Sequence, residues 1–365
     1  MKQISPLAVT WLIVGYLFSF SSNSAAQRLL PNKDQCNLEL LSRYEADFDR
    51  VLARKIAEGA AVNKKTKQRL SKLAMRYIDM SAKCFDQLYK NNQLHDGSLS
   101  QPIHIDNGGI HMPHSIGSQG IEVGEFRLGG TKWGANSPFS VASTGGQNAA
   151  GPGTSGGLVT YSFIPNGVSH QAEVEFGFTS SIDNNLRFSS LPTYSSCFET
   201  EIDRAFAMWS AVADIEFQRV SDNGVPSNGS NTTGDIRVGA HSFDGAFGVL
   251  AHAFFPTSTA FVSQLTIAGD IHFDRAEIWT CDTSGLDIGI VATHEIGHSI
   301  GLSHEEQGAL AIMNPFYNPN LPALTNDDIN GVISIYGASP FVSSPSPGSA
   351  ELIPIIAYLV NDDDQ

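Results

Sequence analysis

Three histidines and one glutamate lie within one short stretch, HEIGHSIGLSH, which runs from His294 to His304. The chain has only 11 histidines, so this concentration asks for an explanation. His294 and His298 are four residues apart, and on a helix such residues lie on one face, about 6 Å apart along the axis. Their rings could therefore hold one metal ion. His304 could supply a third nitrogen if the chain turns back after the helix.

Three neutral imidazoles suit Zn²⁺ and leave its fourth position for water. Zinc lowers the pKa of a bound water towards about 7, and Glu295 could take its proton, so that hydroxide attacks a carbonyl that the ion polarises. This chemistry predicts hydrolysis of peptide bonds. The alternatives are ordinary histidines, or a zinc site that only stabilises the fold. A structural site is usually closed by a fourth protein ligand, often Cys, and the stretch contains no Cys.

The elements that would position these residues can be predicted from residue pattern. The histidine stretch belongs to a helix that starts near Asp287 and stops at Gly301, since glycine readily adopts the left-handed backbone that ends a helix. A second helix starts at Cys197 and is followed by a strand, and a last one, capped by Thr325, covers 325–337. Runs rich in β-branched and aromatic residues predict strands at 157–165, 172–178, 234–240 and 248–255. Strands mixed with a few long helices indicate an α/β or α+β domain over residues 126–338, and we favour α+β.

The rest of the chain divides by composition. Residues 27–95 show apolar positions at helical spacing and predict a helical hairpin. Residues 96–125 are rich in Gly and His without a steady period, which indicates a linker. Residues 339–365 form a Pro/Ser-rich tail whose apolar run is too short to span a bilayer.

The first 26 residues have the features of a secretory signal peptide. Lys2 gives a positive start, an apolar core follows, and small residues near Ala26 offer a cleavage site. We therefore expect a secreted, extracellular protein, with a periplasmic or cell-surface location as alternatives, and no membrane span after signal cleavage. The net charge of −15 argues against nucleic acid as a partner, because nucleic-acid binding needs clustered Lys and Arg.

An exported chain with four cysteines favours two disulfides. Three pairings are possible. We favour Cys36–Cys84 with Cys197–Cys281, because each pair then lies within one proposed region. Metal ligation by these cysteines is less favoured, since no C-x-x-C spacing occurs.

The motif H-E-x-x-H-x-x-G-x-x-H resembles that of the metzincin metalloproteases. The resemblance implies a methionine turn beneath the zinc, and Met313 in AIMNPFY matches it. Three further stretches, FDGAFGVLAHAFFP, AGDIHFDRAEIWT and LTNDDINGVISIYG, resemble the matrixin group within the metzincins. The resemblance covers roughly residues 126–338 and implies a matrixin-like catalytic domain, in which a twisted mixed sheet packs with long helices.

The resemblance also implies further metal sites. His252 and His272 match ligands of a second, structural zinc; the usual His-Gly-Asp segment is missing, so we expect His241 as the third ligand, with a solvated loop histidine as the alternative. Carboxylates match two calcium sites, for which hard oxygen ligands are suited, the alternative being plain loop solvation. The first site comprises Asp244, Asp274 and Glu277, and the second comprises Asp235 and Asp270.

The substrate site follows from the same resemblance. The strand GVLAHAF matches one that pairs with an extended protein or peptide substrate, which gives affinity without strict sequence demands. Gly248, Leu250 and Ala251 are the residues we expect to contact the substrate there. Tyr317 matches the wall of the pocket for the residue after the cut bond, although core packing is an equal alternative.

The latency device of matrixins, a cysteine in a Pro-Arg-Cys-Gly setting, is missing from this sequence. The region before residue 126 could act as a prodomain by another means. We hypothesise that the linker stretch HIDNGGIHMPH covers the zinc in the precursor, the alternative being an unstructured tether.

Together these features predict a secreted zinc-dependent endopeptidase that acts on extended protein substrates. Its zinc ligands are His294, His298 and His304, and Glu295 is the general base. The alternative from a different class is an exported module, stabilised by zinc and calcium, that binds peptides with little turnover.

Overall fold

The computed structural model describes fourteen parts of the 365-residue chain. They are 36–59, 62–90, 105, 121–123, 126–129, 131–134, 141–143, 153–172, 178–188, 195–226, 233–256, 267–282, 285–305 and 310–341. The expected signal peptide, most of the expected linker and residues 342–365 of the tail lie outside them. No helix in the described ranges is both long and apolar enough to cross a bilayer.

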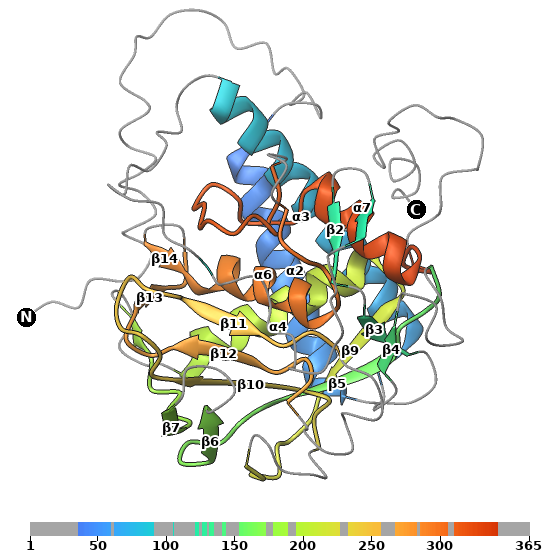
Figure 1. Cartoon of the computed structure of the whole chain (residues 1–365). Helices are drawn as coiled ribbons and strands as arrows, with labels where there is room; N and C mark the ends of the chain where they lie inside the picture. The colour runs from blue at the N-terminus through green and yellow to red at the C-terminus, as the bar shows by residue number, and fades with distance from the viewer. Residues whose placement is uncertain are drawn as a thin grey trace, which may run out of the picture. The chain divides into compact units, whose positions relative to one another are not determined.

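A five-stranded sheet forms the framework of the domain (Figure 1). Its strands, in spatial order, are β11 (Ala251–Ala253), β12 (Ile271–Asp274), β10 (Ile236–His241), β5 (Gly157–Phe163) and β9 (Ile215–Arg219). All neighbours are parallel except β11, which runs antiparallel to β12 at one edge. Every residue of β10, β11 and β12 is buried, as a strand covered on both faces requires. This mixture of sheet and helices confirms the predicted α+β fold.

Two helices connect the sheet to the histidine motif. Helix α4 (Ser195–Val212) buries Ile202, Phe206 and Trp209, and its Trp209 indole donates a 3.0 Å hydrogen bond to the carbonyl of Thr293 in α6 (Ile288–Ser299). Helix α6 packs in turn against β11 and β12. The histidine motif thus lies on a helix that packs against α4 and against the buried strands β11 and β12.

The ends of α6 agree with the sequence. Asp287 caps it, its carboxylate accepting a 2.8 Å bond from the Gly289 amide. Gly301 follows with φ of 106°, and a Cβ there would lie 2.2 Å from the carbonyl oxygen of Thr131. Only glycine meets both conditions, so the helix stops here and the chain turns back towards His304.

Helices α2 (Leu38–Glu58) and α3 (Lys64–Lys90) form the expected hairpin, joined by a Cys36–Cys84 disulfide. The hairpin belongs to the same compact unit as the sheet, residues 36–365, and α3 packs along α4. Arg204 of α4 forms ion pairs with Glu45 (3.1 Å) and Asp49 (2.8 Å) of α2. The second disulfide joins Cys197 to Cys281, so both bonds follow the favoured pairing.

Smaller elements complete the unit. Helix α7 (Asn326–Tyr336) starts with a capping box made by Thr325 and Asp328. The remaining strands are β1 (Ile121–Val123) with β2 (Phe126–Leu128), β3 (Thr131–Trp133) with β4 (Val141–Ser143), β6 (Ser169–Ala172) with β7 (Phe178–Ser181), and a three-stranded sheet of β14 (Leu286–Asp287), β13 (Ile278–Thr280) and β8 (Arg187–Phe188).

Two element predictions were wrong. The single strand expected over 172–178 is instead the two ends of a hairpin, because Ala172 pairs antiparallel with Phe178 and the chain must reverse between them. Residues 121–123, expected in the linker, form β1. Short hairpin strands carry too few residues to show a period in sequence.

Glu201 of α4 lies at the beginning of α6. Its Oε2 is 2.8 Å from where a Cβ on Gly289 would be and 3.2 Å from a guanidinium nitrogen of Arg204. Burial raises the pKa of Glu201 to about 7; Arg204 lowers it and Asp287 raises it further. The folded protein therefore favours the protonated carboxyl group.

This raised pKa predicts a pH-dependent gain in stability for Glu201→Gln. Because the pKa of Glu201 is about 7 in the folded protein and 4.5 in the unfolded chain, the folded state binds its proton more tightly. The resulting stabilisation is complete below pH 4.5 and is lost as the pH rises to 7. Glutamine keeps the shape without the charge, so the stability of the variant relative to wild type should grow by about 1–3 kcal/mol between pH 5 and pH 8. Urea unfolding at the two pH values measures it, with Glu199→Gln on the more exposed part of the helix as the control. A difference that does not change with pH would contradict the assignment.

Candidate metal centre and substrate edge

The structure brings the three motif histidines together. Nε2 of His294 lies 3.1 Å from Nε2 of His298 and 3.2 Å from Nε2 of His304. All three side chains are buried, the most exposed being His304 at 6%. Helix α6 supplies the first two rings, and the turn at Gly301 returns the third.

The other ring nitrogens show which atoms face a metal. Nδ1 of His294 lies 2.7 Å from the carbonyl oxygen of Ile312, and Nδ1 of His298 lies 2.7 Å from that of Leu302. A carbonyl oxygen can only accept, so each Nδ1 carries the hydrogen and each Nε2 presents its lone pair. Lone pairs about 3 Å apart repel one another unless a cation lies between them. The donor set therefore fits Zn²⁺, and the backbone carbonyls fix the ring orientation.

Met313 packs directly beneath this helix. A Cβ on Gly297 would lie 2.2 Å from the Met313 sulfur, so a side chain at 297 would push the methionine out. Asp328 holds the turn, its carboxylate accepting amide hydrogen bonds from Ile312 (2.9 Å) and Met313 (3.2 Å). The same turn supplies the carbonyl that orients His294.

Glu295 follows His294 in α6, and its side chain is completely buried. Burial is costly for a carboxylate unless a cation or proton source is near. The role of Glu295 as general base stays a prediction.

The edge strand β11 packs against α6, the helix that carries His294 and His298. The amides of Leu250 and Ala251, both buried, donate to the carbonyl of Ile105 at 2.9 Å and 3.2 Å, and the Ile105 amide donates to the carbonyl of Pro315 at 2.8 Å. Gly248 lies just before; a Cβ there would be 2.3 Å from the Asp244 carboxylate, so a side chain at 248 would displace that carboxylate. These contacts show that the edge donates main-chain hydrogen bonds to a residue distant in sequence.

Tyr317 has a defined structural partner. Its hydroxyl donates to the carbonyl of Gly285 (2.7 Å) and accepts from the amide of Asp287 (2.9 Å). This ties the segment after Met313 to the beginning of α6. The expected contact of Tyr317 with substrate stays a prediction.

A second cluster is formed by His241, His252 and His272, which come from β10, β11 and β12. His252 and His272 are paired across β11 and β12, and their Nε2 and Nδ1 atoms lie 3.1 Å apart. One ligand nitrogen from each ring lies within 4.8 Å of the others, a separation that a single ion can span. His241, expected only as a substitute ligand, is completely buried in the cluster and is not a solvated loop histidine.

The first carboxylate set surrounds the 243–249 loop. Asp274 accepts from the Phe243 amide (3.3 Å), Glu277 from the Phe247 amide (2.5 Å) and Asp244 from the Val249 amide (3.2 Å). Burial raises the pKa of Glu277 to about 7, and Asp274 and Asp244 add repulsion. One buried oxygen each of Asp274 and Glu277 finds no hydrogen-bond partner among the described residues. Converging carboxylates with spare oxygens fit a hard cation such as Ca²⁺.

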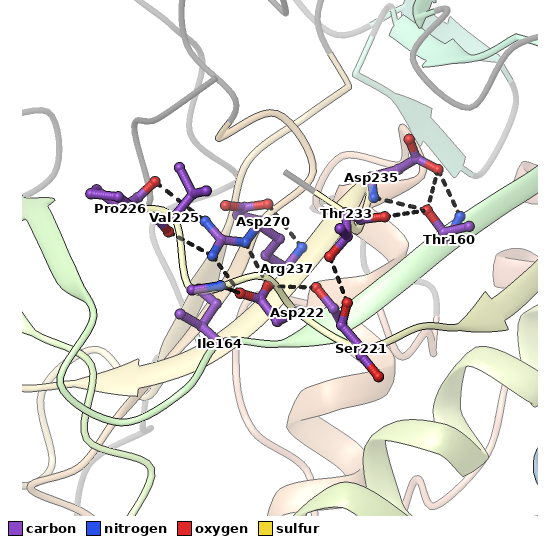
Figure 2. A network of polar contacts seen from close by, with 12 residues as sticks. Thr160, Ile164, Ser221, Asp222, Val225, Pro226, Thr233, Asp235, Arg237 and Asp270 are labelled. Atoms are coloured by element: carbon purple, nitrogen blue, oxygen red, sulfur yellow. Dashed lines mark hydrogen bonds and ion pairs between the residues drawn. The ribbon is translucent and has the colours of Figure 1, made fainter. Parts of the chain in front are cut away.

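The second carboxylate set belongs to a polar network (Figure 2). Asp235 accepts from the amide and hydroxyl of Thr160, both at 2.7 Å, whereas Asp270 accepts from the Arg237 amide at 2.9 Å. The guanidinium of Arg237 makes a two-point contact with Asp222, at 2.8 Å on each side. Each carboxylate thus has its own partner in the chain, and the second calcium site stays a prediction.

Sequence reasoning did not identify three of these residues: Asp328, Arg237 and Ile105. Asp328 stands three residues after Thr325, which is the capping-box spacing and was available as a signal. Arg237 interrupts an apolar strand, and a charge at such a position calls for a buried partner. Ile105 lies in the linker stretch HIDNGGIHMPH, which we hypothesised to cover the zinc, but no local signal marked its contacts with Leu250, Ala251 and Pro315.

Comparison with known proteins agrees with the geometry. The matrixin family model matches residues 180–337. The chain is 42% identical over 145 residues to matrix metalloproteinase-18 of Xenopus laevis, covering 39% of this chain and 29% of that protein. It is 40% identical over 148 residues to interstitial collagenase of Oryctolagus cuniculus (40% and 30%), and 36% identical over 159 residues to metalloendoproteinase 1-MMP of Arabidopsis thaliana (39% and 38%).

The matches cover less than two fifths of the length of each of these three relatives. The similarity therefore describes one region, and not the whole of this chain or of any relative. That region contains both histidine clusters, Glu295 and the methionine turn. Through residues 180–337, this chain is similar to the matrixin family.

Proposed function

We propose that the protein is a secreted zinc-dependent endopeptidase that cuts extended polypeptides. The observation that carries the proposal is the convergence of the Nε2 atoms of His294, His298 and His304, with the Nδ1 atoms of His294 and His298 held by backbone carbonyls. Zinc, when bound there, would polarise the scissile carbonyl and make a nearby water more acidic. The collagenase and metalloproteinase names of the relatives support the same reaction.

The residues of this chain perform the remaining tasks. The β11 edge holds the substrate backbone through the amides of Leu250 and Ala251. Glu295 accepts the proton of the attacking water and returns it to the leaving amine. Met313 and Asp328 keep the helix and the turn in register, so the reacting groups do not need to reorganise.

The other metal sites are part of the proposal. His241, His252 and His272 would hold a structural zinc across three strands, and Asp244, Asp274 and Glu277 would hold calcium and close the 243–249 loop over it. Secretion rests on the first 26 residues, which have the composition of a signal peptide.

Zymography tests the activity. A casein zymogram should show a cleared band that disappears with a zinc chelator and returns when zinc is restored. A band that resists the chelator would refute zinc catalysis. No band in any form of the chain would leave the peptide-binding alternative as the better description.

Metal content tests the ligand assignment separately. Purified chain should contain two zinc ions, and His298→Ala should contain one, with cleavage reduced at least a thousandfold. His170→Ala, a histidine outside both clusters, serves as the control and should keep both ions. Two ions in His298→Ala would show that this ring is not a ligand.

A further inference from the structure

The turn that brings His304 back towards α6 is held from outside the helix. Residues 299–302, called the return turn below, follow His298 and are all buried. The carbonyl groups at the end of a helix have no intrahelical partner, and buried carbonyls need partners elsewhere. The donors to these carbonyls therefore decide where the return turn lies.

Two aromatic side chains supply donors for the first two of these carbonyls. The Trp133 indole of β3 donates a 2.8 Å hydrogen bond to the carbonyl of Ser299. The hydroxyl of Tyr336, the last residue of α7, donates a 2.7 Å bond to the carbonyl of Ile300 and accepts from the Trp133 amide at 3.1 Å. Trp133 is 2% exposed and Tyr336 is inaccessible, so a carbonyl that loses its donor here is left unsatisfied.

Main-chain hydrogen bonds hold the other half of the turn. The Gly129 amide, just after β2, donates to the carbonyl of Gly301 at 2.8 Å. The Ser303 amide donates to the carbonyl of Arg127 at 3.0 Å, and β2 packs beside α7 (Figure 1). Substitution of side chains leaves these bonds intact, so the contribution of the two aromatic residues can be tested by itself.

The return turn controls two of the three imidazoles. The carbonyl of Leu302 lies 2.7 Å from Nδ1 of His298 and accepts its hydrogen. His304 follows two residues later, and its Nε2 lies 3.2 Å from that of His294. A shift of the turn would therefore rotate one ring and displace another. Loss of a group that orients a metal ligand typically lowers metal affinity by about 10–100-fold.

Lys132 helps to fix the ring of Tyr336. Its ammonium donates to the carbonyl of Ile335 at 2.9 Å and lies 5.0 Å from the centroid of the Tyr336 ring. It also donates to the carbonyl and the hydroxyl of Thr154, at 2.6 Å and 2.8 Å. A cation is favourable both beside the last carbonyls of a helix and over an aromatic face. The ring is therefore held where its hydroxyl reaches Ile300.

We propose that Trp133 and Tyr336 are positioning residues of the candidate metal centre. Their side-chain hydrogen bonds hold the return turn in the place from which His298 and His304 converge on a single ion. The inference rests on the proposed function for the presence of zinc, but it concerns how the chain retains the ion and not whether it cuts peptides.

Release of zinc tests the inference without relying on cleavage. The full chain is loaded with zinc and mixed with an excess of a chromogenic chelator, which records release from each histidine cluster. His298→Ala, which should lack the ion of the first cluster, identifies the phase that belongs to the second. Tyr336→Phe removes one oxygen, and Trp133→Phe removes the indole N–H. Each should release zinc from the first cluster about tenfold faster than wild type, with release from the second cluster unchanged.

Tyr161→Phe is the matched control. Tyr161 is another buried tyrosine, 4% exposed, and its hydroxyl donates to Asp203 at 2.5 Å, outside the return turn. The control loses a comparable hydrogen bond and should release both ions at the wild-type rates. The visible spectrum of the cobalt-loaded chain gives a second readout, because cobalt absorption depends on the geometry of its ligands. The spectrum should change in the two test variants and stay unchanged in the control.

Two results would overturn the inference. Release from the first cluster at the wild-type rate in both test variants would show that the return turn does not need these bonds. Equal acceleration of release from both clusters would show a general loosening of the fold. Because the two variants remove different donors, failure of one to fold leaves the other decisive.

The outcome is separable from that of the proposed function. Faster release from the first cluster in the test variants, without peptide cleavage by wild type, would support the positioning role and refute the peptidase. Chelator-sensitive cleavage by wild type with unchanged release in both test variants would do the reverse.

Discussion

Glu295→Gln should abolish peptide cleavage while leaving the metal content at two zinc ions per chain. The carboxylate is the group expected to take a proton from water, and loss of a general base costs about 10²–10⁴-fold in rate. Glutamine has nearly the same shape and none of the histidine ligands is changed, so the metal site should persist. Cleavage of a quenched fluorescent peptide gives the rates, and elemental analysis gives the metal content.

The control is Glu216→Gln in β9, the strand at the opposite edge of the sheet from β11. The Glu216 side chain is about one third exposed, and the variant should cut at the wild-type rate. Cleavage by Glu295→Gln within tenfold of wild type would refute the assigned role. Loss of zinc together with activity would make Glu295 a residue that supports the site instead of the base.

Arg237→Met should destabilise the fold by about 3–5 kcal/mol, since it leaves the buried Asp222 carboxylate without its cation. Both side chains of this pair are essentially inaccessible, at 0% and 1% exposure. Burial alone would raise the pKa of Asp222, yet hydrogen bonds from Arg237, Gly224 and Ser162 hold it below its ordinary value. The pair thus stabilises the protein at neutral pH, and that contribution falls in acid as the carboxylate is protonated.

Urea unfolding of zinc-loaded protein measures the loss. Arg275→Ala removes the arginine of an ion pair with Asp183 whose side chains are 41% and 29% exposed, and should cost less than about 1 kcal/mol. Arg237→Met combined with Asp222→Leu should recover part of the stability, because no unpaired charge remains. If Arg237→Met lost as little unfolding free energy as the control Arg275→Ala, the Arg237–Asp222 network (Figure 2) would not be a determinant of stability.

Local signals predicted the catalytic helix well. The i, i+4 histidines, Gly301 and the Thr325 cap act within one or two turns of chain, and the structure places them as expected. The disulfide pairing was also predicted correctly from the division of the chain into regions, since each bond joins two cysteines of the same region. The first histidine cluster followed from the spacing of His294, His298 and His304, whereas the resemblance to matrixins supplied the second.

Contacts between distant segments could not be predicted in this way. Arg237 forms an ion pair with Asp222, and Arg204 forms ion pairs with Glu45 and Asp49 of another helix. In the sequence, nothing distinguishes either arginine from one on the surface. Ile105 is a more extreme case, because its partners are main-chain groups that any sequence provides. The single strand expected at 172–178 was wrong because β propensity does not reveal where a chain reverses.

The arrangement of the two disulfides has a consequence for maturation. Cys36–Cys84 closes within the α2–α3 hairpin and Cys197–Cys281 within the sheet region, so neither links one to the other. A single nick between Lys90 and Ile121 would therefore leave two polypeptides with no covalent bond between them. They would stay associated through the interface of α3 with α4 and the Arg204 ion pairs, and the hairpin would remain as a bound light chain against α4, the helix that packs against α6.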